Sequence, residues 1–204
     1  INIRERKRIF LQLIRYSLIT FVRIFKGIWS REISISRDIE QTESDFLIIS
    51  HLMNKELIYK KNDFYFGDIP SKLNEFGMSS TVIMINHIGI KKFMPPSDWE
   101  NVQNSRIILS RSMSFVDEIK IYLTQIKEAL RLKKMKSASE FYTRVFKEAS
   151  MQALSSSTAN NLRLKKQVSE ILKIVKPKCI MVTYEGHAWE HLIFSEARKI
   201  DSNI

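Results

Sequence analysis

Residues 179–191 decide the fold, and they read CIMVTYEGHAWEH. The first four are apolar or β-branched and follow shortly after Pro177, a pattern typical of a buried strand. Apolar residues then recur at helical spacing over 188–199. Between the two segments, Gly186 permits a backbone conformation that a residue with a Cβ resists. The stretch therefore predicts a strand, a tight turn and a helix.

The rest of the domain alternates in the same way. Apolar runs predict further strands, and helical periodicity predicts further helices. The strands are expected at 46–52, 81–87 and 106–109, and the helices at 69–76, 114–136, 141–149 and 162–175. Apolar strands alternating with helices indicate a mostly parallel sheet covered on both faces. We expect an α/β, Rossmann-like domain over 45–204, with about four or more strands flanked by helices.

Two expectations concern burial. Cys179 is the only cysteine, so no disulfide can form within the chain, which favours a reducing compartment. Because it lies in a predicted core strand, we expect it to be buried. The helix that begins at Ser114 is expected to pack through one apolar face, formed by Phe115, Ile119, Tyr122, Leu123, Ile126 and Leu130.

The chain of 204 residues has a formal net charge of +11, which attracts anionic partners. Nucleic acid is not expected, because the basic residues lack the interleaved aromatic side chains of a stacking platform. The chain starts at Ile1 rather than Met, and we expect it to be part of a longer protein.

Residues 4–29 predict a basic amphipathic helix with a broad apolar face, followed by a polar linker to residue 44. Arg15 and Arg23 inside the apolar run argue against a membrane span. One interpretation places this helix in an anionic membrane interface. The other docks its apolar face on the protein itself.

Polar side chains follow each predicted strand. His51 ends the first, and His87 follows the second. Arg111 and Ser112 follow the third, and Glu185 and His187 the fourth. Parallel strands finish on one edge of the sheet, where ligands bind in open α/β folds. For His51 and His87, a polar loop residue with a local hydrogen bond is the plainer interpretation.

Glu185 is the candidate catalytic residue. A carboxylate on a tight turn, shielded by Tyr184 and Trp189, can have its pKa raised and act as a general base. The alternative is an anchor that accepts backbone N–H bonds. Glu190 lies in the first turn of the last helix, where a carboxylate favours the helix dipole and closes a capping box.

The segment His187-Ala188-Trp189-Glu190-His191 matches the H-x-x-E-H zinc motif of inverted zincins. A catalytic zinc needs a third protein ligand, and the strand-end turn suits this stretch better than a mid-helix zinc pair. No metal site is therefore expected.

Residues 178–193, with TYEGHAWE at their centre, resemble a segment of bacterial surface-carbohydrate biosynthesis proteins, glycosyltransferases of the two-Rossmann-domain (GT-B) type. In that family the segment closes the N-terminal, acceptor-side domain, and a C-terminal domain that holds the nucleotide sugar follows. The resemblance implies that Glu185 is the base for the acceptor hydroxyl. It also implies that Glu185 and His187 face the interdomain cleft and that His187 or Arg111 contacts anionic groups of the acceptor or donor. The other predicted substrate-binding residues, chosen from their places at the strand ends and in the turn, are Ser112, His87, His51 and Trp189.

Together these features predict the acceptor-side domain of a glycosyltransferase that moves sugar from a nucleotide-sugar donor to a surface polysaccharide or lipid-linked glycan. It would be inactive alone, would hold no cofactor itself, and would be cytoplasmic or peripheral at the inner face of the membrane. The alternative is a non-catalytic α/β domain that binds an anionic ligand or partner.

Overall fold

The computed structural model describes residues 14–22, 43–58, 62–89 and 105–202, together with Lys7, Leu11, Phe25 and Lys60. They form two compact units. The helical unit draws on 1–30 and 112–163, and the sheet unit on 31–111 and 164–204. The sequence predicted that only the N-terminal segment is separate from the domain over 45–204. In the structure, residues 112–163 belong to the same unit as residues 1–30. Most of the predicted linker lies outside the described residues.

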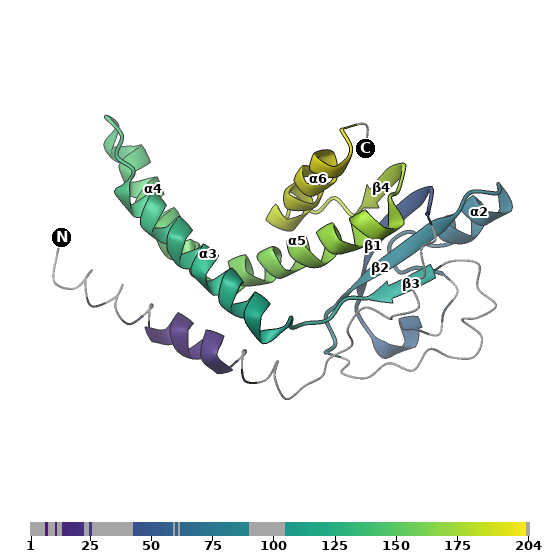
Figure 1. Cartoon of the computed structure of the whole chain (residues 1–204), viewed down its shortest axis with the longest axis horizontal. Coiled ribbons are helices and arrows are strands. Elements are labelled where there is room, and N and C mark those ends of the chain that lie inside the picture. Colours follow the sequence, from purple (N-terminus) through teal and green to yellow (C-terminus); the bar gives the residue numbers. More distant parts are fainter. Residues whose placement is uncertain are drawn as a thin grey trace. The chain divides into compact units, whose positions relative to one another are not determined.

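The sheet unit contains four parallel strands in the order β3-β2-β1-β4 (Figure 1). The strands are β1 (Phe46–Leu52), β2 (Ser80–Asn86), β3 (Ser105–Ile108) and β4 (Cys179–Val182). Each lies within two residues of its predicted position. The predicted α/β, Rossmann-like class with a parallel sheet is confirmed.

Both faces of the sheet are covered. On one, residues of β1, β2 and β3 pack against α6 (Ala188–Ile200) and the part of α5 (Ser156–Val175) from Leu164 onward. On the other, they pack against the 3-10 helix η1 (Lys55–Ile58) and Leu73 of α2 (Ile69–Glu75). Successive strand residues enter opposite clusters, since side chains alternate along a strand. Helix α2 has Pro70 in its first turn and Gly77, at φ +73°, beyond its end, which is the usual placement of these residue types.

The prediction that Cys179 is buried was wrong, because its side chain is exposed. It opens β4, which lies at one end of the strand order, and the other β4 residues are only half-buried. Among the described residues no strand pairs with the outer side of β4. An apolar sequence predicts a strand but does not say whether that strand is central or terminal.

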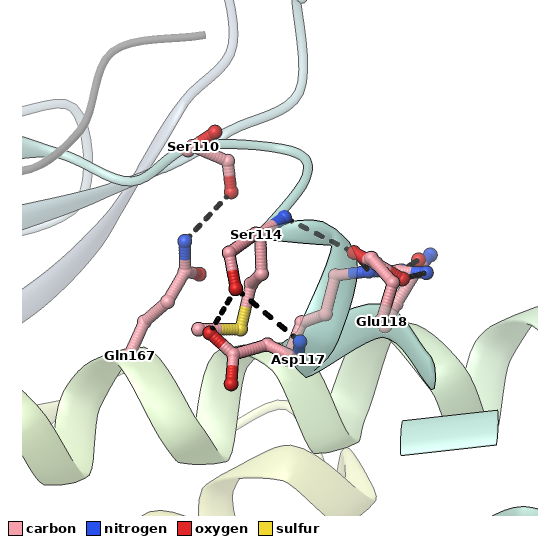
Figure 2. A network of polar contacts seen from close by, with 8 residues as sticks. Ser110, Ser114, Asp117, Glu118 and Gln167 are labelled. Carbon is pink, nitrogen blue, oxygen red and sulfur yellow. Dashed lines mark hydrogen bonds and ion pairs between the residues drawn. The ribbon is translucent and has the colours of Figure 1, made fainter. Parts of the chain in front are cut away.

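The helical unit contains α3 (Phe115–Lys134), α4 (Glu140–Gln152) and the start of α5. Ser114 caps α3: its Oγ accepts a hydrogen bond from the Asp117 backbone N–H at 3.2 Å and donates to the Asp117 carboxylate at 2.7 Å (Figure 2). The predicted apolar face of α3 is only partly covered: Ile119, Tyr122 and Ile126 are half-buried. Leu123 is 57% and Leu130 is 53% exposed.

The buried side of α3 instead consists of Glu118, Ile121, Gln125 and Ala129. Its polar members are fully bonded to neighbouring helices and their termini. Glu118 pairs with Arg163 through two hydrogen bonds, and Gln125 donates to the carbonyls of Ala153 and Ser155. Buried polar groups are tolerated when they are hydrogen-bonded in this way. The apolar pattern of α3 therefore does not identify its most buried side, which includes hydrogen-bonded polar residues.

Residues 14–22 are helical, in agreement with the predicted N-terminal helix. Ser17 contacts α3 through a 2.8 Å hydrogen bond between its Oγ and the Tyr122 hydroxyl. Six apolar side chains of the N-terminal segment are exposed: Leu11, Ile14, Leu18, Phe21, Val22 and Phe25. None of the described helices is long and apolar enough to cross a membrane.

Candidate functional site

The predicted convergence of polar residues at the carboxyl ends of the strands is present in the sheet unit. His51 lies near the end of β1, His87 directly follows β2, and Thr183 directly follows β4. The His87 backbone N–H bonds to the Leu52 carbonyl at 3.3 Å, which holds the ends of β1 and β2 level. These three residues, with the turn at 185–187, form what we call the edge site.

His51 is the centre of the edge site. Its Nδ1 lies 2.7 Å from His87 Nε2, and its Nε2 lies 3.2 Å from Thr183 Oγ1. Its ring is 6% exposed and contacts the edge of Trp189, with the centroids 5.5 Å apart. Burial, followed by the nearby His87, lowers the pKa of His51 below the ordinary 6.5. His51 is therefore hydrogen-bonded on both sides, and its burial disfavours the charged form.

His87 is the exposed partner of that pair. Its pKa is lowered first by desolvation and then by Arg111. Arg111 crosses Gly89: its Nη1 lies 2.6 Å from where a Cβ on Gly89 would stand, and Gly89 has φ +69°. The positive backbone angle favours a glycine here, and the guanidinium occupies the space that a Cβ would take. Arg111 and His87 thus bring basic groups to the same edge.

The turn after β4 carries a carboxylate–imidazole pair. His187 Nε2 lies 3.1 Å from Glu185 Oε2, and both side chains are partly exposed. Gly186 between them has φ +76°, as its sequence position predicted. Glu190 anchors the turn from α6, since its Oε1 accepts the Glu185 backbone N–H at 2.9 Å. Glu190 therefore ties down the strand-end turn rather than closing a capping box on His187.

The predicted rise in the pKa of Glu185 was wrong. The hydrogen bond from Tyr65 lowers the pKa of Glu185 most, desolvation opposes it with the next-largest effect, and the hydrogen bond from His187 lowers it further. Tyr184, expected to shield Glu185, is 84% exposed. Glu185 is therefore a stable carboxylate that accepts hydrogen bonds. The other member of the pair, His187, is the remaining candidate for a general base.

Tyr65 was not singled out from the sequence. It lies on a turn organised by Asp63, whose Oδ1 accepts the backbone N–H groups of Tyr65 and Phe66 and the Ser50 hydroxyl. The bond to Glu185 raises the pKa of Tyr65, because an anionic tyrosine could no longer donate it. Thr183 was also missed, although its place directly after β4 marks it as an edge residue. The position of Tyr65 carries no comparable signal.

Two predicted site residues have other placements. Trp189 is buried in the core beneath the site and supports His51 rather than facing a ligand. Ser112 belongs to the helical unit and not to the unit that carries the edge site. Among the described residues no group of three or more His, Cys, Asp and Glu side chains could hold a metal ion.

Comparison of the chain with models of protein families, with curated proteins and with solved structures gives no match.

Two hydrogen-bonded systems coexist in the edge site. In the first, the Glu185 carboxylate accepts the Nε2–H of His187, so neutral His187 keeps Nδ1 as a proton acceptor. In the second, one proton lies between His51 and His87, and its direction depends on the tautomer that Thr183 favours. An imidazole oriented by a carboxylate is the usual arrangement of a general base that works near neutral pH. The edge site can thus accept a proton and bind an anion.

Proposed function

We propose that this chain is the acceptor-side domain of a glycosyltransferase that uses a nucleotide sugar. Its proposed acceptor is a surface polysaccharide or a lipid-linked glycan. The observation that carries the proposal is the His187–Glu185 pair at the carboxyl edge of a parallel sheet, within the TYEGHAWE segment. In open α/β folds this edge is where ligands bind.

The geometry changes the roles inside the pair. His187 is proposed as the base, since its Nδ1 can take the proton of the acceptor hydroxyl. Glu185 fixes the tautomer and orientation of His187 and stabilises the imidazolium that forms. Arg111 and His87 would contact anionic groups of the acceptor or donor. The donor itself would be bound by a further nucleotide-binding domain of the protein.

The test is a donor screen on the product of the complete gene, with a panel of nucleotide sugars and glycan acceptors. His187→Gln should lower turnover by about 10²–10⁴-fold, the usual contribution of a positioned general base. Glu185→Gln should also lower turnover and should shift its pH dependence, because the orienting negative charge is lost. Retained turnover in His187→Gln would reject the assignment of the base.

A non-catalytic anion-binding domain is the second candidate, favoured by the approach of Arg111 to Gly89 beside His87. It predicts binding of nucleotides or inorganic phosphate without turnover of any donor. Turnover measured beside titration calorimetry separates the two candidates, because Arg111→Gln should weaken anion binding under either, whereas His187→Gln changes turnover only if the domain is catalytic.

A further inference from the structure

The positive charge of the chain is concentrated in the helical unit. Segments 1–30 and 112–163 contain 16 basic and 6 acidic residues, a net charge of +10. The segments of the sheet unit contain 17 basic and 16 acidic residues, a net charge of +1. The edge site therefore lies in a nearly neutral unit, and the charge needs a separate explanation.

The outer side of α3 combines apolar and basic residues in adjacent rows. The apolar row is exposed and contains Phe115, Val116, Leu123 and Leu130. Beside it, Lys120, Lys127, Arg131 and Lys134 follow one another at spacings of seven, four and three and are also exposed. At such spacings they lie along one side of a helix. The two rows form what we call the outer face of α3.

The N-terminal helix also carries exposed apolar side chains. It contacts α3 through the Ser17 hydroxyl, and six of its described apolar side chains are exposed: Leu11, Ile14, Leu18, Phe21, Val22 and Phe25. Complete burial of one such side chain contributes about 1.5–3 kcal/mol of stability. Exposure of several of them on two helices of one unit therefore favours a binding partner that covers them. Large exposed apolar patches mark interaction surfaces.

From these observations we infer that the helical unit docks on an anionic lipid surface through the outer face of α3 together with the apolar side of the N-terminal helix. The apolar side chains enter the boundary between lipid headgroups and acyl chains. The basic row, formed by Lys120, Lys127, Arg131 and Lys134, lies at the level of the lipid phosphates. The charge decides the occupant, because two copies with a net charge of +10 on this unit repel each other, whereas anionic lipid attracts it. This inference does not depend on the proposed glycosyl transfer.

The experiment is co-sedimentation of the whole chain with vesicles. One set is pure phosphatidylcholine, and the other contains equal parts of phosphatidylcholine and phosphatidylglycerol. The wild type should sediment with the mixed vesicles only, and added salt should weaken the binding. Lys120→Gln combined with Lys127→Gln should lower the partition coefficient by about 25-fold, or about fivefold per lysine.

The matched charge control combines Lys55→Gln and Lys173→Gln, two exposed lysines of the sheet unit, and should sediment like the wild type. Leu123→Ser with Leu130→Ser should lower partition by about tenfold or more. Its apolar control is Phe76→Ser in the sheet unit, where the side chain is 77% exposed. Thermal unfolding followed by circular dichroism checks that each variant is folded.

Equal binding to both vesicle types, or no binding by the wild type, would overturn the inference. A concentration-dependent dimer in analytical ultracentrifugation that Leu123→Ser abolishes would also overturn it, because this face would then join two copies. If the leucine variants unfold, the paired lysine variants still decide the outcome.

Discussion

The buried ion pair of the helical unit gives the sharpest test of the energetics. Glu118 accepts from Arg163 Nε at 2.5 Å and from Nη2 at 2.8 Å, and it also accepts the Met113 backbone N–H at 3.0 Å. The side chains are 2% and 6% exposed. Glu118→Gln removes the negative charge and leaves Arg163 buried without a counter-charge. Breaking a buried pair from one side costs about 3–5 kcal/mol.

Glu140 provides the matched control, because it pairs with Arg144 at 2.6 Å in the same unit with side chains 80% and 78% exposed. Glu140→Gln should cost only about 0.3–0.5 kcal/mol, since solvent screens an exposed pair on one helix. Urea unfolding of the whole chain measures both variants. At a slope of about 2 kcal/mol per M, Glu118→Gln should lower the midpoint by about 1.5 M or more.

A third variant separates the charge from the packing. Replacing both partners, Glu118→Leu with Arg163→Met, should recover most of the lost stability, since apolar residues of similar volume can substitute for a buried pair. If Glu118→Gln loses no more stability than Glu140→Gln, the pair is not buried in solution and the reasoning is refuted.

Three further outcomes are expected from unfolding experiments. Gly186→Ala should cost about 1–2 kcal/mol from its φ of +76° alone, since nothing lies within 4 Å of the added Cβ, and an unchanged urea midpoint would contradict that angle. His51 and His87 hold lowered pKa values, so the unfolded chain binds more protons just below pH 6.5 and stability should fall as pH drops through that region. The combined variant His51→Gln and His87→Gln should flatten that slope in urea midpoints measured against pH. Lys178, then Ser79, lower the pKa of Asp45 to about 2, so its stabilising contribution is complete above 3.8 and lost toward pH 2, and Asp45→Asn should remove this dependence.

The arrangement of the edge site explains why some roles were predictable. His51, His87 and Glu185 follow or end apolar strands, and parallel strands must finish on one edge, so their meeting follows from chain order. Their protonation behaviour does not follow from chain order. Tyr65 reaches Glu185 from a turn 120 positions earlier in the chain. Its hydrogen bond lowers the pKa of Glu185, whereas the sequence alone predicted a raised pKa.

The sequence by itself determined the elements, their parallel pairing and the glycine turn at 186, because these depend on local spacing and on backbone angles. Only the tertiary structure decided which side of each helix is inside. On α3 the inner side contains Glu118 and Gln125, and the outer side contains Leu123 and Leu130. The physical reason is that burial depends on whether distant chain segments supply hydrogen-bond partners. For Glu118 the partner is Arg163, 45 residues away, and no periodicity within α3 reveals it.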